Sequence, residues 1–199
     1  MAIYYISDLH LGHANVIRFD NRPFDSIEEM EEEIVKRWNE RVKSQDTVNI
    51  LGDFCWKTES EWIRILKRLN GNKVLIRGNH DPKQVSGKLR KYFADVKDYK
   101  EILDNGRRVC MSHFPMLLHK HSYDPNCYML CGHVHITSEN DWLEKWRGEL
   151  RANRHGRAAN QGNVINVGAM MPYVNYTPRT LDELIEGVGF NDGLCNQEH

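Results

Sequence analysis

Short apolar runs recur along this chain, and each of them ends in a polar motif made of Asp, Asn and His. The first three runs, at residues 3–7, 47–51 and 73–77, are rich in β-branched and aromatic residues and are separated by stretches with helical period. This alternation is typical of β-α-β units and predicts a mostly parallel sheet in the first half of the chain. The closing motifs are, in order, Asp8-Leu9-His10, Gly52-Asp53, Gly78-Asn79-His80-Asp81, Ser112-His113 and Gly132-His133-Val134-His135. In open α/β sheets the ligand site lies beyond the carboxyl ends of the strands, so we expect the motifs to share one site.

Helices are predicted between the first strands. Ser26 followed by Glu29, and Thr58 followed by Glu61, both read as capping boxes that begin helices. The first helix should run to about Val42, and a third helix is expected around 83–93. Three side chains of the second helix region are expected to point inward: Trp62, Leu66 and Leu69.

The second half of the chain has a different pattern. Runs at 99–103 and 108–112 flank Asn105-Gly106, a pair that favours a tight hairpin turn, and two further strands are expected at 128–131 and 164–167. This half is therefore predicted to be antiparallel or mixed. Residues 138–162 are rich in charge without clear period and read as an inserted loop or lid. The segment Trp142 to Trp146 could stack a base, but packing of this loop is the expected role. A short helix should start at Thr180, and the tail from about 187 should fray. We expect a single domain over 1–199.

Composition narrows the possible partners. The chain has 199 residues and a net charge of -1, so the totals give no electrostatic signal for nucleic acid or acidic membrane, although a local basic patch is not excluded. The opening run reaches Asp8 too early for a signal peptide, and no apolar run approaches the roughly 18 residues of a membrane span, so we expect a cytoplasmic protein. The cysteines are odd in number and are expected to be free and mostly buried: Cys55, Cys110, Cys127, Cys131 and Cys195.

The residue types in the five motifs point to metal chemistry. Carboxylate, amide and imidazole groups are the ligands that divalent transition metals accept, and a carboxylate can bridge two such ions about 3.5 Å apart. Two ions can lower the pKa of a shared water and clamp phosphate oxygens in an in-line displacement. No Cys lies in any of these motifs, which fits direct attack by water rather than a covalent nucleophile. The sequence therefore predicts a paired-metal hydrolase.

The ordered motifs resemble the signature of the calcineurin-like metallophosphoesterases, over about residues 3–167. The continuation Gly12-His13-Ala14-Asn15 and the stretch 19–24 are most similar to compact bacterial and phage-type phosphohydrolases. The resemblance implies an α/β fold of two packed mixed β-sheets flanked by helices, a four-layer sandwich. It also implies that Asp8, His10 and His135 hold one ion, that Asn79, His113 and His133 hold the other, and that Asp53 bridges them. The implied cofactors are two divalent ions, with manganese first and iron, zinc, nickel or cobalt as alternatives.

The catalytic assignment follows from this ligand set. His80 adjoins Asn79 but is surplus to the ligand count, so it is the candidate acid that protonates the departing oxygen or positions the phosphate. Asp81 is the candidate that orients His80. Some members of the family carry an orienting Asp three residues after the bridging one, and here that position is Trp56. The predicted enzyme is a metal-dependent phosphoric ester hydrolase, acting on a phosphate mono- or diester by attack of metal-activated hydroxide.

Further residues are candidates for binding a small phosphoester substrate. Arg22 and Arg77 could clamp phosphate oxygens, although salt bridging is the commoner role of Arg. His13 lies close enough in sequence to His10 to reach the same site, and His119 and His121 could line the pocket from a loop.

Three alternatives are weighed against this interpretation. Cys127, Cys131, His133 and His135 could form a structural zinc site, but that would leave Asp8, His10, Asp53 and His113 without a role. A nuclease acting on DNA or RNA would be expected to carry a basic groove, and this chain is short and close to neutral. A non-catalytic scaffold on the same fold would have lost ligand residues, and none is lost here. We therefore expect a small-molecule substrate, no nucleic-acid partner and no membrane partner.

Overall fold

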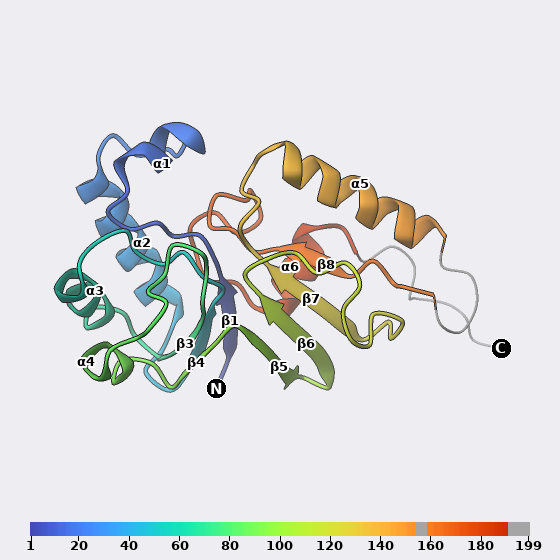
Figure 1. Ribbon diagram of the computed structural model, residues 1–199, viewed down its shortest axis with the longest axis horizontal. Coiled ribbons are helices and arrows are strands. Elements are labelled where there is room, and N and C mark those ends of the chain that lie inside the picture. Colours follow the sequence, from blue (N-terminus) through green and yellow to red (C-terminus); the bar gives the residue numbers. More distant parts are fainter. Residues whose placement is uncertain (154–158, 191–199) are drawn as a thin grey trace.

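The computed structural model describes residues 1–153 and 159–190, and two four-stranded sheets lie at its centre (Figure 1). The first sheet is entirely parallel in the order β1-β2-β3-β4. Its strands are β1 (Ile3–Ile6), β2 (Thr47–Ile50), β3 (Asn72–Ile76) and β4 (Asp95–Lys97). The second sheet, in the order β5-β6-β7-β8, is mixed: β5 and β6 are antiparallel, and the other pairs are parallel. Its strands are β5 (Tyr99–Asp104), β6 (Arg107–Ser112), β7 (Cys127–Cys131) and β8 (Val164–Asn166).

The predicted hairpin is confirmed. Asn105 and Gly106 join β5 to β6 with φ angles of 48° and 81°, the left-handed conformation that an Asn-Gly turn accepts. The three predicted strands of the first sheet are also confirmed to within a residue at each end. Strand β4 was missed, because its run of three residues is half-exposed and carries two charges.

Six helices occur in the described ranges. They are α1 (Ala14–Phe19), α2 (Ile27–Arg41), α3 (Glu59–Leu66), α4 (Gly87–Arg90), α5 (Ser138–Ala152) and α6 (Leu181–Gly187). Ser26 caps α2 by accepting from the backbone N–H of Glu29, as expected, and Thr180 forms a complete capping box at α6. Thr58 makes no side-chain cap, however, and the predicted helix over 83–93 shrinks to the single turn of α4.

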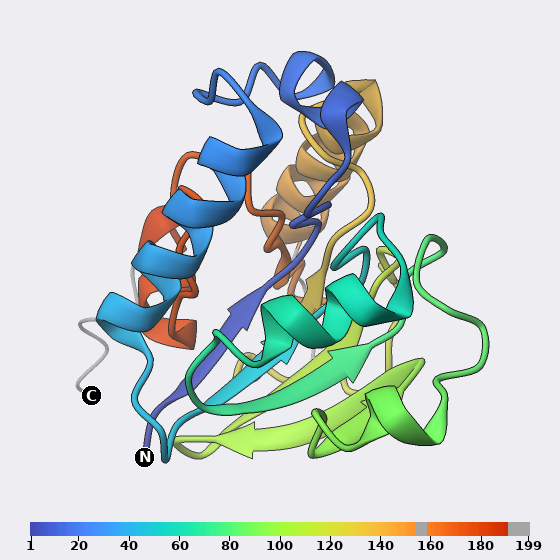
Figure 2. The ribbon, with the colours of Figure 1, turned by 90° about the vertical axis from the view of Figure 1, so that its left-hand side faces the viewer.

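The two sheets pack face to face, and helices cover both outer faces (Figures 1 and 2). Along β6, Val109 and Met111 belong to the main core shared with the first sheet, whereas Cys110 belongs to a smaller cluster on the opposite face. That smaller cluster includes Leu143 of α5, so α5 covers the outer face of the second sheet. Trp38 of α2 and Trp62 of α3 are fully buried in the main core, on the side of the first sheet. The expected four-layer α/β sandwich is confirmed.

The segment 138–162 is the main error of the sequence interpretation. Residues 138–152 form helix α5 rather than a loop, and its buried residues are only Asn140 and Leu143. Trp142 and Trp146 are exposed rather than packed inside. Residues 154–158 and the tail from 191, including Cys195, lie outside the described residues.

Two smaller expectations concern cysteines and membranes. Cys55, Cys110, Cys127 and Cys131 are free and buried, as expected. In residues 1–153 and 159–190, no helix combines the length and the apolar character that a bilayer span requires.

Candidate metal centre

The polar motifs meet beyond the carboxyl ends of strands from both sheets. Each chain segment turns sharply there, and several residues that are not glycine take left-handed φ angles between 45° and 72°. In the motifs these are Asp8, His10, Asp53, His133 and His135. L-residues disfavour this conformation by about 1 to 2 kcal/mol each, so the surrounding structure must hold the turns in place. These turns bring side chains from three separate loops to one point.

Two glycines allow the backbone segments to approach this closely. A Cβ atom on Gly78 would lie 2.2 Å from Oδ1 of Asp53, and one on Gly132 would lie 2.3 Å from Oδ2 of Asp8. The Asp53 carboxylate fills the first space, and the Asp8 carboxylate fills the second together with the Ser7 hydroxyl, 2.0 Å from the same Cβ. These two positions therefore require glycine because a side chain would displace Asp53 or Asp8.

The first half of the centre contains Asp8, His10 and His135, whose candidate ligand atoms all lie within 4.8 Å of one another. The Nε2 atoms of His10 and His135 are only 3.2 Å apart, and Nε2 of His135 lies 3.5 Å from Oδ1 of Asp8. All three residues are buried or nearly so. Two imidazole nitrogens and a carboxylate oxygen that converge in this way form a donor set that fits a divalent transition ion.

The second half contains His113, Asn79 and Asp53. Nε2 of His113 lies 3.0 Å from Oδ1 of Asn79 and 3.5 Å from Oδ2 of Asp53. The same Oδ2 atom lies 3.6 Å from Nε2 of His10 in the first half. One carboxylate oxygen of Asp53 thus faces both halves of the centre. The geometry also groups Asp8 with Asp53 and His113, so Asp8 too lies near both halves.

His133 is placed at the edge of the centre. Its ring centroid lies 5.2 Å from that of His113 and 4.6 Å from that of Phe114. Its backbone N–H donates to the Asp8 carboxylate, at 3.1 Å from Oδ2. Among the described residues, the groups whose candidate ligand atoms converge within 4.8 Å do not include His133.

Burial and neighbouring charges shift the pKa values in the centre. Burial, followed by the neighbouring His135, lowers the pKa of His10 to about 3, so this ring is neutral and has a free lone pair. Burial would raise the pKa of Asp53, but the hydrogen bond with His113 and its charge lower that pKa to about 2. For His113, burial is outweighed by Asp53 and Asp8, which raise its pKa to about 9. Burial raises the pKa of Asp8. The centre holds carboxylate oxygens close together, and positive charge would stabilise them.

Asp20 supports the centre from outside, and sequence reasoning missed it. Its Oδ1 atom lies 2.8 Å from Nδ1 of His135, while Oδ2 accepts from Nε and Nη2 of Arg22 at 2.9 and 2.8 Å. A carboxylate on the far nitrogen of a ligating His fixes the orientation and tautomer of the ring. The only available signal was the sequence 19–24, and it carries no indication of contact with a residue 115 positions later.

Arg22 is not a phosphate clamp. Its side chain is completely buried and bonds Asp20 and the carbonyl oxygens of Asp8 and Leu9. This fully committed guanidinium holds the loop that carries the first motif. The prediction for Arg22 is therefore wrong, and the commoner structural role of Arg applies.

His80, Trp56 and His13 form an aromatic rim at the mouth. The His13 ring stacks on Trp56 at 4.5 Å between centroids, and Trp56 lies 4.4 Å from His80. Nε2 of His80 is 3.9 Å from Oδ2 of Asp53, and its side chain is 41% exposed, so it borders the centre and remains open to a substrate. The buried Nδ1 atom of His13 has no hydrogen-bond partner in the described part of the chain.

Asp81 does not orient His80. Its carboxylate is buried and accepts from the backbone N–H groups of Asp53, Phe54 and Gly78 at 3.0, 3.0 and 2.8 Å. These contacts tie the loop of Gly78 to the loop of Asp53. The catalytic interpretation of Asp81 is wrong, and the neighbour that packs against the His80 ring is Trp56.

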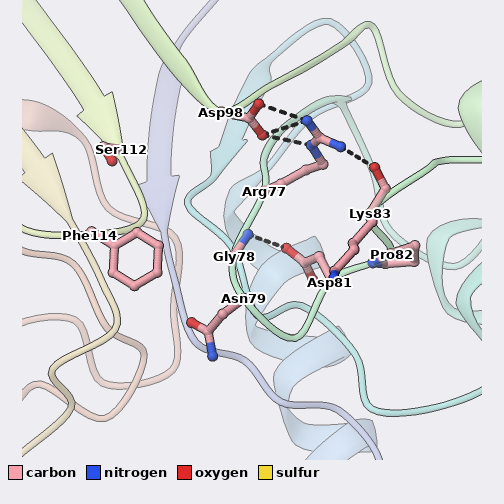
Figure 3. Close-up of a pocket in the computed structure, with 9 residues that line it drawn as sticks. All are labelled: Arg77, Gly78, Asn79, Asp81, Pro82, Lys83, Asp98, Ser112 and Phe114. Carbon is pink, nitrogen blue, oxygen red and sulfur yellow. Dashed lines mark hydrogen bonds and ion pairs between the residues drawn. The ribbon is translucent and has the colours of Figure 1, made fainter.

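A cleft of about 420 Å³ opens beside the His113 half of the centre (Figure 3). Phe114 lies across from the segment that carries Gly78 and Asp81, with Asn79 at one end of the cleft and Arg77 at the other. The Arg77 guanidinium is paired with Asp98, with both N–O distances at 2.7 Å, and also donates to the carbonyl of Lys83. Arg77 thus lines the cleft, where Asp98 offsets its charge, and its predicted role as a phosphate clamp stays a prediction.

The structural zinc site proposed as an alternative does not form. Sγ of Cys131 lies 3.6 Å from the carbonyl oxygen of Ile165, while His135 faces Asp8 and His10. His119 is buried beside Cys110 and Cys127 rather than in the cleft, and His121 lies near the Tyr123 hydroxyl.

Comparison with known proteins agrees with this architecture. A family model described as calcineurin-like phosphoesterase matches residues 1–156. The uncharacterized protein MJ1445 of Methanocaldococcus jannaschii is 36% identical over 142 residues, which cover 70% of this chain and 73% of that protein. The Gene 66 protein of Mycobacterium phage L5 is 37% identical over 81 residues, or 39% of each chain. The crystal structure of AQ665, a protein of unknown function from Aquifex aeolicus, superposes with a TM-score of 0.65 at 28% identity, over 92% of this chain and 97% of that one.

Proposed function

Because the chain belongs to the calcineurin-like phosphoesterase family, we propose that it hydrolyses a phosphate mono- or diester with two divalent ions. Membership of this family supports a metal-dependent phosphoesterase in general. The proposal of two ions rests on the position of Asp53, whose Oδ2 atom lies 3.6 Å from Nε2 of His10 and 3.5 Å from Nε2 of His113. A single oxygen between two imidazoles from different halves of the centre is suited to serve two ions.

We assign the ligands as follows. Asp8, His10 and His135 would hold one ion, Asn79, His113 and His133 would hold the other, and Asp53 would be shared. When bound, two divalent ions lower the pKa of water and stabilise the charge on phosphate oxygens. The His133 ring centroid lies 5.2 Å from that of His113, so its side chain would have to rotate toward His113 to join the second half. Manganese is the first ion to test.

The residues around the ions bind and orient the substrate. Asn79 belongs to the centre and also lines the cleft, so a phosphate bound at the centre would have its ester group in the cleft, beside Phe114. A small substrate suits this volume, because pockets of about 300 to 1,000 Å³ hold small molecules. Phosphorus is attacked directly by water, and no side chain becomes phosphorylated.

His80 donates the proton to the departing oxygen. It is exposed enough to contact substrate, and Nε2 lies 3.9 Å from Asp53. The His80 ring packs against Trp56 with the two ring planes tilted by 52°, and this contact limits the rotation of His80 and favours one orientation toward the centre. A positioned general acid contributes about 10²- to 10⁴-fold to a rate.

The test compares two leaving groups. With His80→Ala, hydrolysis of an alkyl phosphate should fall by about 10²- to 10⁴-fold, and hydrolysis of a nitrophenyl phosphate by much less, because nitrophenolate leaves without a proton. Bound metal, measured by elemental analysis, should be unchanged. Equal losses on both esters would assign His80 to phosphate positioning, and loss of metal would contradict its assignment as an acid.

The breadth of substrates is tested separately. The purified protein should be assayed with monoesters, diesters and single- and double-stranded DNA in the presence of Mn²⁺, Zn²⁺, Ni²⁺ or Co²⁺. Faster cleavage of DNA than of every small ester would contradict the small-substrate proposal and favour a nuclease.

A further inference from the structure

A second group of metal-binding side chains lies on the outer face of the second sheet. Cys110 is in β6, and Cys127 is the first residue of β7. The register pairs Arg108 with Cys127, so Cys110 and Cys127 are diagonal neighbours on one face, with their Sγ atoms 3.9 Å apart. His119 reaches the same point from the connection between the two strands, and the candidate ligand atoms of all three residues lie within 4.8 Å of one another.

This group is separate from the Asp-His centre. Cys110 and Cys127 belong to the small cluster under α5, whereas Val109 and Met111 on either side of Cys110 face the main core. No residue is shared between the two sets. The second sheet therefore separates the two thiols from the main core.

The distances fit a tetrahedral ion. Two sulfurs at about 2.3 Å from a tetrahedral zinc lie roughly 3.8 Å apart, and the observed separation is 3.9 Å. The carbonyl oxygen of Lys120 faces the same point, at 3.9 and 3.8 Å from the two sulfurs and 3.0 Å from Nδ1 of His119. Four donor groups of three kinds thus surround one small volume.

The burial and chemistry fit as well. Cys110 and Cys127 are fully buried, and His119 is 6% exposed. Two thiolates would neutralise a zinc ion, so the complex carries no net charge and its burial avoids the cost of an isolated ion. Buried cysteines alone are commonly ordinary apolar packing. Apolar packing does not explain why an imidazole and a carbonyl oxygen lie beside the two thiols.

We propose that Cys110, His119 and Cys127 bind one zinc ion, and that the Lys120 carbonyl completes the coordination or fixes the His119 ring. The ion would fasten the connection 113–126 to the two strands that it joins. This connection begins with His113 of the Asp-His centre and Phe114 of the cleft. The structural ion thereby holds in place one wall of the substrate site without contacting substrate.

Cobalt substitution provides the test. The metal-free protein is reconstituted with Co²⁺, and its near-ultraviolet and visible absorption is recorded. A thiolate-to-cobalt charge-transfer band with intense tetrahedral d–d bands is expected, because the Asp-His centre contains no sulfur ligand. Elemental analysis should give about one zinc per chain beyond the ions of that centre.

Variants identify the ligands. Cys110→Ser and Cys127→Ser should each abolish the charge-transfer band and the additional zinc. Cys131→Ser is the matched control, because Cys131 is equally buried on the same face but points to the Ile165 carbonyl, and it should retain both signals. His10→Gln should also retain the band, so failure of the Asp-His centre is distinguishable from failure of this site.

Two spectroscopic results would overturn the proposal. Folded wild-type protein that shows no thiolate-to-cobalt band, or a band that survives in both serine variants, excludes the site. If the serine variants do not fold, thiol titration of the wild type decides: zinc should slow the reaction of two thiols, and a chelator should restore it. Equal reactivity with and without zinc would contradict the assignment.

Discussion

Replacing Asp20 by Asn tests how the metal centre is supported. Asp20 uses both carboxylate oxygens as acceptors, one for Nδ1 of His135 and the other for the guanidinium of Arg22. An Asn side chain has the same shape but offers one acceptor and one donor, so it can satisfy only one of these partners. The other partner then faces an N–H group.

Two effects of different size are expected. Loss of an outer-shell carboxylate typically lowers metal affinity by about 10- to 100-fold, which corresponds to about 1.4 to 2.8 kcal/mol. Breaking a buried ion pair on one side costs about 3 to 5 kcal/mol, and the side chain of Arg22 is completely buried. Because the amide oxygen of Asn keeps one partner, we expect the lower end of that range. For a chain of this size, about 3 kcal/mol lowers Tm by roughly 6 to 12 °C.

The assay separates the two effects. The Tm of the metal-free protein measures the contribution of the ion pair to stability. Competition with a chelator of known affinity measures the affinity for the metal. Asp182→Asn is the control, because Asp182 also pairs with an arginine, Arg107, but is 69% exposed, and its change should stay within about 1 kcal/mol.

Two results would refute this reasoning. Unchanged metal affinity together with a lowered Tm would make Asp20 a partner of Arg22 only. Unchanged Tm in metal-free protein would show that the buried guanidinium does not depend on the Asp20 charge.

Three further predictions concern the centre itself. Gly132→Ala places a Cβ 2.3 Å from Oδ2 of Asp8 and should lower activity by about 10²-fold, because the ligand is misplaced. Gly148→Ala on α5 is the control, because its Cβ meets nothing within 4 Å. It should leave kcat unchanged and raise the free energy of unfolding by about 0.5 to 1 kcal/mol. Asp53→Asn should reduce phosphoester hydrolysis more than Asn79→Asp, since Asp53 faces both halves whereas Asn79 contacts His113 in one of them, and equal losses would argue against a shared ligand. Removal of metal by a chelator should abolish hydrolysis and lower Tm, because an ion present at about 100 times its Kd stabilises the native state by about 2.7 kcal/mol; activity that survives complete removal would contradict a metal-dependent reaction.

The sequence predicted those parts of the fold that depend on local pattern. The strands of the first sheet are short β-branched runs, and both faces of that sheet are covered, so the apolar runs mark them clearly. Helix α5 was missed for the opposite reason. It buries only Asn140 and Leu143, so no apolar stripe distinguishes it from a charged loop.

The sequence was enough to predict which residues form the candidate site, but not which side chains contact one another. The ligand types and their order at strand ends are visible in the sequence, and the structure brings Asp8, His10, Asp53 and His135 within a few ångströms of one another. Partner choice is different, because it depends on directions that the sequence does not contain. Asp81 follows His80 directly and yet turns toward the backbone of Phe54, whereas Asp20 reaches His135 across 115 positions.

The left-handed turns at the metal centre set stability against activity. At Asp8, His10, Asp53, His133 and His135 the backbone takes a conformation that glycine adopts without penalty. Replacing such a ligand by glycine would remove chemistry and relieve about 1 kcal/mol of local strain at once. Laboratory selection for thermal resistance alone would therefore not preserve these ligands. A designer who grafts only the side chains onto an ideal backbone would leave out the strained loops that make them converge.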